Sequence, residues 1–265
     1  MHLPWSRMRW MQDALLEWFG DTARDLPWRK THDPYAILVS EVMLQQTQVA
    51  RVVPRYLEWL ARWPTAAALA AASRAEVLAA WVGLGYNRRA LALHAAAAAV
   101  ARDGWPEDLR TLPGVGPYTA AAVASFAFGA QVAAVDTNAR RVAARLGHGP
   151  PDALVPPGRA ADWNQAAMEL GATVCTARTP RCGACPVAAW CVSAGRPAAP
   201  AASARRGASE RFEDSNRWVR GRVVAALAKG EGLPADIAAE RVERAVAGLV
   251  RDGLVRRVDG GFSLG

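Results

Sequence analysis

The cysteines of this chain are confined to one short segment near residue 180. The 265 residues contain only four, spaced as Cys175-x6-Cys182-x2-Cys185-x5-Cys191. Four thiolates so close in sequence can enclose a cubane iron–sulfur cluster or a tetrahedral zinc ion, because both need soft ligands that converge from a compact loop. Disulfides are disfavoured, since nothing in the sequence indicates an oxidising compartment. The segment therefore predicts a loop that brings the four side chains together around a metal centre.

Helical periodicity dominates the chain from its N-terminus. Trp10, Leu15 and Phe19 are spaced for one apolar face of a helix, and Asp33-Pro34 is typical of an N-cap followed by proline at the first helical position. Hydrophobic residues make up 52% of the sequence, enough for a buried core. We expect a mostly α-helical fold, with helices at residues 34–50, 52–62, 74–81, 87–102, 118–128, 138–146 and 163–174.

The composition changes after residue 193 to Ala, Pro, Ser and Arg, which predicts a linker at 194–213. Beyond it the pattern predicts helices at 217–228, 234–239 and 239–252, then two short strands at 254–258 and 262–264 joined by turn residues. This order resembles a small winged helix. Such a unit binds DNA, docks a protein partner or serves a structural purpose, and the sequence leaves these alternatives open.

The charge of the chain suits a polyanionic partner. The formal net charge is +8 and the isoelectric point is 10.0, although arginine-rich surfaces also arise from mutational bias in GC-rich genomes. The sequence lacks an apolar run of the roughly 18–20 residues that a membrane span needs, and its first 20 residues do not have the pattern of a secretory signal. We expect a cytoplasmic, nucleoid-associated protein that does not associate with membranes.

A glycine hairpin runs directly into a predicted helix. In Leu112-Pro113-Gly114-Val115-Gly116, the glycines allow the backbone to approach a phosphate closely, and the free N–H groups at the start of the following helix supply donors. Gly-x-Gly alone also fits an ordinary turn between helices. A grip on a nucleic-acid backbone and an ordinary turn are therefore both open for this run on its own.

Two acidic residues occupy positions that invite a functional explanation. Glu41 interrupts an apolar run on a predicted helix, where a carboxylate is costly unless it is paired, protonated or used. A structural pairing with Arg29 or Arg51 is the alternative. Asp136 follows a short apolar stretch and precedes a helix that it could cap. Capping and catalysis are compatible, because backbone N–H donors keep a carboxylate ionised, as a cation-stabilising residue must be.

In this order, the segments resemble the helix-hairpin-helix DNA glycosylases over residues 8–193. The runs Leu26–Arg29, Ser40–Gln48 and Gly83–Tyr86 follow the motifs of the MutY-type adenine glycosylases. The cysteine spacing matches the iron–sulfur loop of the same superfamily, which implies a structural [4Fe-4S] cluster rather than zinc. The resemblance implies an all-α fold with a six-helix barrel at 26–129 and a cluster module at 1–25 and 130–193, followed by the winged-helix-like α+β unit at 214–265.

The resemblance also implies roles for individual residues. Glu41 would be the general acid and later base, and Asp136 the stabiliser of the sugar cation, with Tyr118 and Asn138 in support. The expected DNA contacts are Arg29, Gln46, Leu84, Tyr86, Gly114, Val115, Gly116, Thr119, Arg178 and Arg181. Bifunctional relatives carry a lysine at the position of Tyr118, and a phenol cannot form an imine with the sugar. A monofunctional glycosylase is therefore implied.

The implied reaction is hydrolysis of the N-glycosidic bond of adenine mispaired with 8-oxoguanine or guanine, after the nucleotide has left the base stack of double-stranded DNA. The 74 residues after Cys191 are too few for the Nudix-like domain with which typical MutY proteins read 8-oxoguanine. Two alternatives remain, a thymine glycosylase for G/T mismatches and a non-catalytic DNA-binding module. We expect a monomer whose C-terminal unit could recruit repair or replication proteins.

Overall fold

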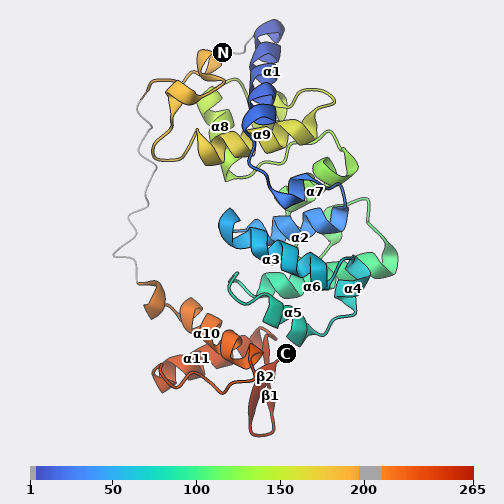
Figure 1. Cartoon of the computed structure of the whole chain (residues 1–265), viewed down its shortest axis with the longest axis vertical. Coiled ribbons are helices and arrows are strands. Elements are labelled where there is room, and N and C mark those ends of the chain that lie inside the picture. The colour runs from blue at the N-terminus through green and yellow to red at the C-terminus, as the bar shows by residue number, and fades with distance from the viewer. Residues whose placement is uncertain (1–3, 197–210) are drawn as a thin grey trace. The chain divides into compact units, whose positions relative to one another are not determined.

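The computed structural model describes residues 4–196 and 211–265 (Figure 1). The chain forms two compact units. Unit 1 combines the residues up to Leu38 with Val115–Arg205, and unit 2 combines Val39–Gly114 with the residues from Arg206 onward. Each unit is thus assembled from two stretches that are distant in sequence.

Unit 1 is built around one apolar core shared by three long helices. Met11 and Leu15, four residues apart on α1, are fully buried against Leu146 of α8 and Leu170 of α9. Trp10, which the periodicity assigned to the same face, is 61% exposed, so that prediction was wrong. The elements of this unit are α1 (Trp5–Thr22), η1 (Pro27–Arg29), the first residues of α2 (Pro34–Leu44), α7 (Pro117–Phe128), α8 (Thr137–Leu146), η3 (Pro151–Leu154), α9 (Ala160–Thr173), η4 (Cys182–Ala184) and η5 (Ala188–Trp190).

Unit 2 joins the central helices to the C-terminal elements. Trp59 of α3 and Trp81 pack edge to face in its core, with ring centroids 5.4 Å apart. A guanidinium N–H of Arg74 on α5 donates to the Gly253 carbonyl at 2.7 Å, which ties the C-terminal elements to the same unit. Its elements are the rest of α2, α3 (Val49–Arg62), α4 (Ala66–Ala70), α5 (Arg74–Ala80), α6 (Arg88–Asp103), η2 (Leu109–Thr111), η6 (Phe212–Asp214), α10 (Asn216–Ala228), α11 (Ala239–Arg251), β1 (Val255–Val258) and β2 (Gly261–Leu264).

The C-terminal strands form an antiparallel hairpin in which Val255 pairs with Leu264 and Val258 with Gly261. Both strands were predicted, as were α10 and α11. The short helix predicted at 234–239 was wrong: the chain makes a turn there and becomes helical only at Ala239. Buried Ile237 anchors the turn, which explains the apolar signal. Residues 197–210 of the predicted linker lie outside the described residues, and the predicted domain boundaries stay a prediction.

The helix predicted at 34–50 ends earlier in the structure, and the helix predicted at 52–62 begins earlier. α2 ends at Leu44 and α3 begins at Val49, because Gln46 adopts the left-handed backbone region with φ of 54°. A non-glycine residue is strained there by about 1–2 kcal/mol, and such residues cluster at functional sites. The remaining predicted helices agree with the structure to within a few residues. In the described ranges, no helix has both the length and the apolar character needed to cross a membrane.

Candidate functional site

Glu41 lies in the middle of α2 with 5% of its surface exposed, between the buried residues Val39 and Met43. The predicted structural partner Arg29 is committed elsewhere. Its guanidinium lies 2.8 Å from the carboxylate of Glu169 on α9 and stacks over the ring of Phe19. The helix therefore carries a buried carboxyl group, and burial of a carboxylate is costly unless the group is hydrogen-bonded, paired or used.

Arg89 holds the C-terminal end of the helix that carries Glu41. One guanidinium nitrogen donates to the carbonyls of Val42 at 2.7 Å and Gln45 at 2.6 Å, where the last carbonyls of α2 have no partners within the helix. The other donates to the carbonyls of Leu84 and Gly85, each at 3.0 Å. Burial lowers the pKa of Arg89, and nearby Tyr86 opposes that shift. A single cation thus joins α2 to the Gly83–Tyr86 loop.

Asp136 is the N-cap of α8, as the sequence allowed. Its Oδ1 accepts from the backbone N–H of Ala139 at 2.6 Å, and its Oδ2 accepts from the side-chain amide of Asn138 at 2.9 Å. Both oxygens of the carboxylate are therefore fixed in position by donors. The segment before it is fixed by the buried Asn164, whose side chain accepts from Ala134 N–H and donates to the Val132 carbonyl.

A chain of hydrogen bonds leads from Asp136 to the cysteine loop. The amide oxygen of Asn138 accepts from the guanidinium of Arg141 at 2.7 Å, and Arg141 donates in turn to the carbonyl of Cys175 at 2.9 Å. α8 and α9 approach closely at this point, because a Cβ on Gly171 would lie only 2.6 Å from that of Asn138. A displacement of the cysteine loop would therefore be transmitted to Asp136 through three contacts. They join Cys175 to Arg141, Arg141 to Asn138 and Asn138 to Asp136.

All four cysteines line one cavity of about 270 Å³. They form no disulfide, and Arg145 donates to the sulfur of Cys175 at 3.3 Å. Burial, reinforced by the neighbouring thiols, raises the pKa of Cys185 to about 11, so a cationic group must be bound before this thiol gives up its proton at neutral pH. Four thiols that line one cavity are ligands that a cubane iron–sulfur cluster or a zinc ion can accept.

The glycine hairpin has two glycines with different requirements. Gly114 has φ of +74°, and a Cβ there would lie 2.6 Å from the Cβ of Ala92. Gly116 has open space around it and forms the N-cap of α7, with Pro117 at the first helical position. Val115 and Thr119 are buried, so their expected DNA contacts would use backbone groups. The first glycine is needed for the turn itself, whereas the second keeps the backbone accessible.

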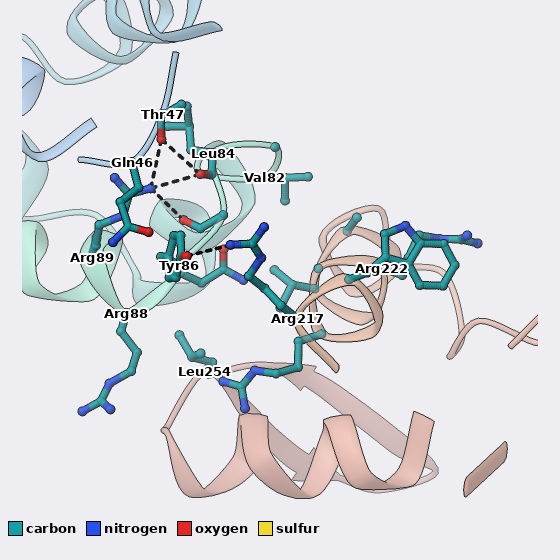
Figure 2. A pocket seen from close by; sticks show the side chains of 18 of the residues that line it. Gln46, Thr47, Val82, Leu84, Tyr86, Arg88, Arg89, Arg217, Arg222 and Leu254 are labelled. Atoms are coloured by element: carbon teal, nitrogen blue, oxygen red, sulfur yellow. Dashed lines mark hydrogen bonds between the residues drawn. The ribbon is translucent and has the colours of Figure 1, made fainter. Parts of the chain in front are cut away.

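Three expected DNA-contacting residues lie together on one wall of a large cleft in unit 2. Gln46, Leu84 and Tyr86 line it with the C-terminal helix α10 opposite (Figure 2). Tyr86, like Gln46, has a left-handed backbone, with φ of 49°. Of the expected phosphate contacts near the cysteines, Arg178 is exposed, and Arg181 is exposed while donating to the Thr173 carbonyl.

The predicted catalytic residues are divided between the units. Glu41 belongs to unit 2, whereas Asp136, Asn138 and Tyr118 belong to unit 1, where the Tyr118 hydroxyl lies 3.8 Å from the sulfur of Met168. The approach of Glu41 to Asp136 stays a prediction, as do the individual DNA contacts.

Several residues important to the site were missed by sequence reasoning. Arg89, Arg141, Asn164 and Glu169 each hold a segment that carries a predicted functional residue. A polar residue at a buried helical position was the signal that singled out Glu41, and the same signal could have identified Asn164 and Glu169, both about 1–2% exposed on α9.

Two segments of the chain match known protein families. Residues 39–154 match the HhH-GPD superfamily of base excision DNA repair proteins, and residues 175–191 match the iron–sulfur binding domain of endonuclease III. The second match contains all four cysteines and confirms the expected [4Fe-4S] cofactor in place of the zinc alternative, while the assignment of each cysteine as a ligand stays a prediction.

Two adenine DNA glycosylases are similar to this chain. The adenine DNA glycosylase of Mycobacterium tuberculosis H37Rv is 47% identical over 284 residues, covering 94% of this chain and 92% of that protein. The human adenine DNA glycosylase is 44% identical over 208 residues, covering 67% of this chain and 38% of that protein. Because 94% of this chain is matched, the mycobacterial similarity extends into the C-terminal unit.

Solved structures show the same fold. A thermostable thymine-DNA glycosylase superposes with a TM-score of 0.65 at 30% identity, covering 71% of this chain and 96% of that one. A trapped covalent complex of endonuclease III with DNA superposes with a TM-score of 0.62 at 24% identity, covering 72% and 97%. The helix-hairpin-helix architecture expected from the sequence is confirmed.

Proposed function

The chain belongs to the adenine DNA glycosylases of the helix-hairpin-helix superfamily, and from that premise we propose that it hydrolyses the N-glycosidic bond of adenine mispaired with 8-oxoguanine or guanine. The 47% identity to a mycobacterial adenine DNA glycosylase over nearly the whole chain is the observation that carries this proposal. The buried acid on α2 and the capped acid on α8 support it.

Glu41 is the proposed general acid. Adenine leaves poorly as an anion, so protonation of a ring nitrogen lowers the barrier to bond cleavage. Glu41, buried on α2, would supply this proton from its carboxyl group to an extruded base. Once ionised, the same group can accept a proton from the attacking water.

Asp136 is the proposed stabiliser of the sugar cation that forms as adenine departs. Hydrogen bonds from the Ala139 N–H and the Asn138 amide hold its carboxylate at the start of α8. The two acids therefore take opposite roles because their surroundings differ, one apolar and one rich in donors.

The proposal includes the absence of lyase activity. A lyase needs an amine that forms a Schiff base with the sugar, and the residue at the corresponding place is Tyr118. The product would be an intact strand with an abasic site. The [4Fe-4S] cluster, held by Cys175, Cys182, Cys185 and Cys191, supplies a rigid support for its loop rather than a step of this reaction.

We also propose that the enzyme is a monomer and that it acts on chromosomal DNA in the cytoplasm. A repair or replication partner of the C-terminal unit is part of the same proposal. Sedimentation of the holoenzyme with and without duplex DNA would measure the oligomeric state, and a stable dimer would contradict the first point.

The decisive experiment offers the holoenzyme three duplexes, with A opposite 8-oxoguanine, A opposite G and T opposite G. Strand cleavage is read before and after alkali treatment. We expect adenine release from the first two and cleavage only after alkali. Release of thymine alone would instead favour the activity named for the thymine-DNA glycosylase structure, and cleavage without alkali would contradict the monofunctional assignment.

Glu41→Gln tests whether the chain acts as an enzyme rather than as a DNA-binding module. Gln retains the shape of the side chain but cannot donate a carboxyl proton. We expect unchanged affinity for the duplex and loss of base excision. Excision at the wild-type rate would remove Glu41 from the mechanism.

A further inference from the structure

Asn164 on α9 places a buried amide among three segments of unit 1, with 2% of its surface exposed. Its amide oxygen accepts from the backbone N–H of Ala134 at 3.1 Å. Its amide nitrogen donates to the Val132 carbonyl at 2.9 Å and to the Ser125 hydroxyl at 3.0 Å. Because the oxygen and both N–H groups are used, three contacts fix the orientation of this amide.

The segment that leads to Asp136 has no regular secondary structure of its own. Residues 129–136 lie between the end of α7 and the start of α8 and form neither helix nor strand. Val132 and Ala134 are two positions apart, the spacing at which backbone polar groups of an extended chain face the same side. Asn164 therefore pairs with this segment as a neighbouring strand would, and the buried backbone of Ala134 gains the partner that it needs.

The third contact of Asn164 leads to the helix of the glycine hairpin. Ser125 is 1% exposed on α7, and α7 begins directly after its N-cap, Gly116. One amide thus joins α9, α7 and the segment before Asp136. The helix that starts at the expected DNA grip is thereby held in a defined place relative to the acid.

Asp136 is anchored on both sides, and the two anchors differ in kind. Its carboxylate accepts from Asn138 and Ala139, which belong to α8 and move with it. Ala134, two residues before the acid, is instead tied to α9 and α7 through Asn164. Only the second anchor sets where the start of α8 lies relative to the other two helices.

We propose that Asn164 is a positioning residue for base excision, which places the Asp136 carboxylate where the sugar cation develops. The inference rests on the proposed role of Asp136. Electrostatic stabilisation of a transition state depends on groups that are in place before the reaction begins. A misplacement of about 1 Å is enough to slow a reaction on the order of a hundredfold. Asn164 acts through Asp136, because its own polar atoms are buried and already bonded.

The test measures how tightly the holoenzyme binds duplexes in which one of two sugar analogues replaces the target nucleotide. A pyrrolidine analogue carries a protonated ring nitrogen and mimics the sugar cation, whereas tetrahydrofuran is a similar ring without the charge. A correctly placed carboxylate favours the charged ring, as expected for a mimic of the transition state. The ratio of the two Kd values therefore reports the placement of Asp136 separately from general affinity for DNA.

Asn164→Ala should lower the preference for the charged ring about tenfold and leave the Kd for tetrahydrofuran at the wild-type value. Single-turnover excision of adenine should slow by a similar factor. Gln131→Ala is the matched control, because Gln131 also joins two segments through its amide. Its bonds, to the Pro156 carbonyl and from the Gly158 N–H, lead to another loop, and its side chain is exposed. This variant should keep the wild-type preference.

Ser125→Ala removes only one of the three bonds and decides the question if Asn164→Ala does not fold. It should lower the preference about threefold. A wild-type preference in both variants would overturn the positioning role. Equal weakening of both Kd values in Asn164→Ala would also overturn it, because Asn164 would then support the DNA-binding surface as a whole. Failure of the proposed function is distinguishable, since the wild-type enzyme itself would then release no adenine and show no preference for the charged ring.

Discussion

Asn138 donates a hydrogen bond of 2.9 Å to the carboxylate of Asp136, and this contact is the first link between the acid and the cysteine loop. Its amide oxygen also accepts from Arg141, whose guanidinium reaches the Cys175 carbonyl. The cysteine loop is therefore mechanically continuous with the acid proposed to stabilise the sugar cation. A loop rigidified by the cluster would limit the positions that Asp136 can adopt.

Asn138→Ala should impair excision more than it impairs folding. The variant keeps the Cβ that packs at Gly171 but loses two hydrogen bonds, each contributing about 1 kcal/mol to stability. A similar loss from transition-state stabilisation slows the reaction about tenfold. Single-turnover rates and urea unfolding would measure both effects. Thr137→Ala, at the exposed neighbouring position, is the control, and a wild-type rate for Asn138→Ala would contradict a positioning role.

The two glycines of the hairpin should separate stability from DNA binding. Gly114→Ala places a Cβ 2.6 Å from Ala92 on a left-handed backbone, so the free energy of unfolding should fall by about 2 kcal/mol. Gly116→Ala meets open space and should unfold like the wild type, but its methyl group would obstruct a closely approaching phosphate. We expect only Gly116→Ala, of the two variants, to bind duplex DNA with a higher Kd than the wild type. Equal stability of the two variants would refute the distinction.

Arg89→Met should destabilise unit 2 strongly. Five backbone carbonyls lose a charged donor, and hydrogen bonds from a charged group contribute about 1.5–3 kcal/mol. A urea titration should give a lower midpoint, by about 3 kcal/mol in unfolding free energy. Arg88→Met, at the exposed adjacent position, should leave the midpoint unchanged. If the two variants unfold alike, Arg89 does not hold α2 to the following loop.

Glu169→Gln should reduce stability in a pH-dependent way. Burial alone would raise the pKa of Glu169, but hydrogen bonds from Arg24 and Arg29 outweigh it and lower the pKa below the ordinary value of 4.5. A carboxylate with a lowered pKa stabilises the fold fully above its unfolded-state pKa, and this contribution is lost as the pH falls through the folded-state pKa.

We therefore expect Glu169→Gln to be less stable than the wild type by about 2 kcal/mol at pH 7, with a gap that closes below about pH 4.5. Thermal unfolding between pH 3 and 7 would measure it. Asp25→Asn is the matched control, because the Asp25–Lys30 pair is exposed and such pairs contribute little. A gap that stays constant with pH would show that the charge of Glu169 does not stabilise the fold.

The features that the sequence alone predicted are those that depend on residues close to one another in the chain. The cysteine spacing, the glycine hairpin and the cap at Asp136 each depend on neighbours within about twenty positions, so residue type and spacing suffice to recognise them. The same holds for the long helices, whose apolar periodicity is strong. It failed at Gln46, where a left-handed residue follows the end of α2 inside the helix predicted at 34–50, and at Trp10, where the periodic apolar face includes an exposed ring.

Long-range packing decided the rest. Nothing in the spacing of Arg29 and Glu169 assigns them to each other, because they are 140 residues apart and meet only where the helices of unit 1 bury them. The same is true of Arg217 and Tyr86, 131 residues apart, whose contact brings the C-terminal helix to the cleft wall. Such pairings follow from the burial and shape of whole helices, which no local pattern encodes, and they determine which of many arginines remain available to DNA.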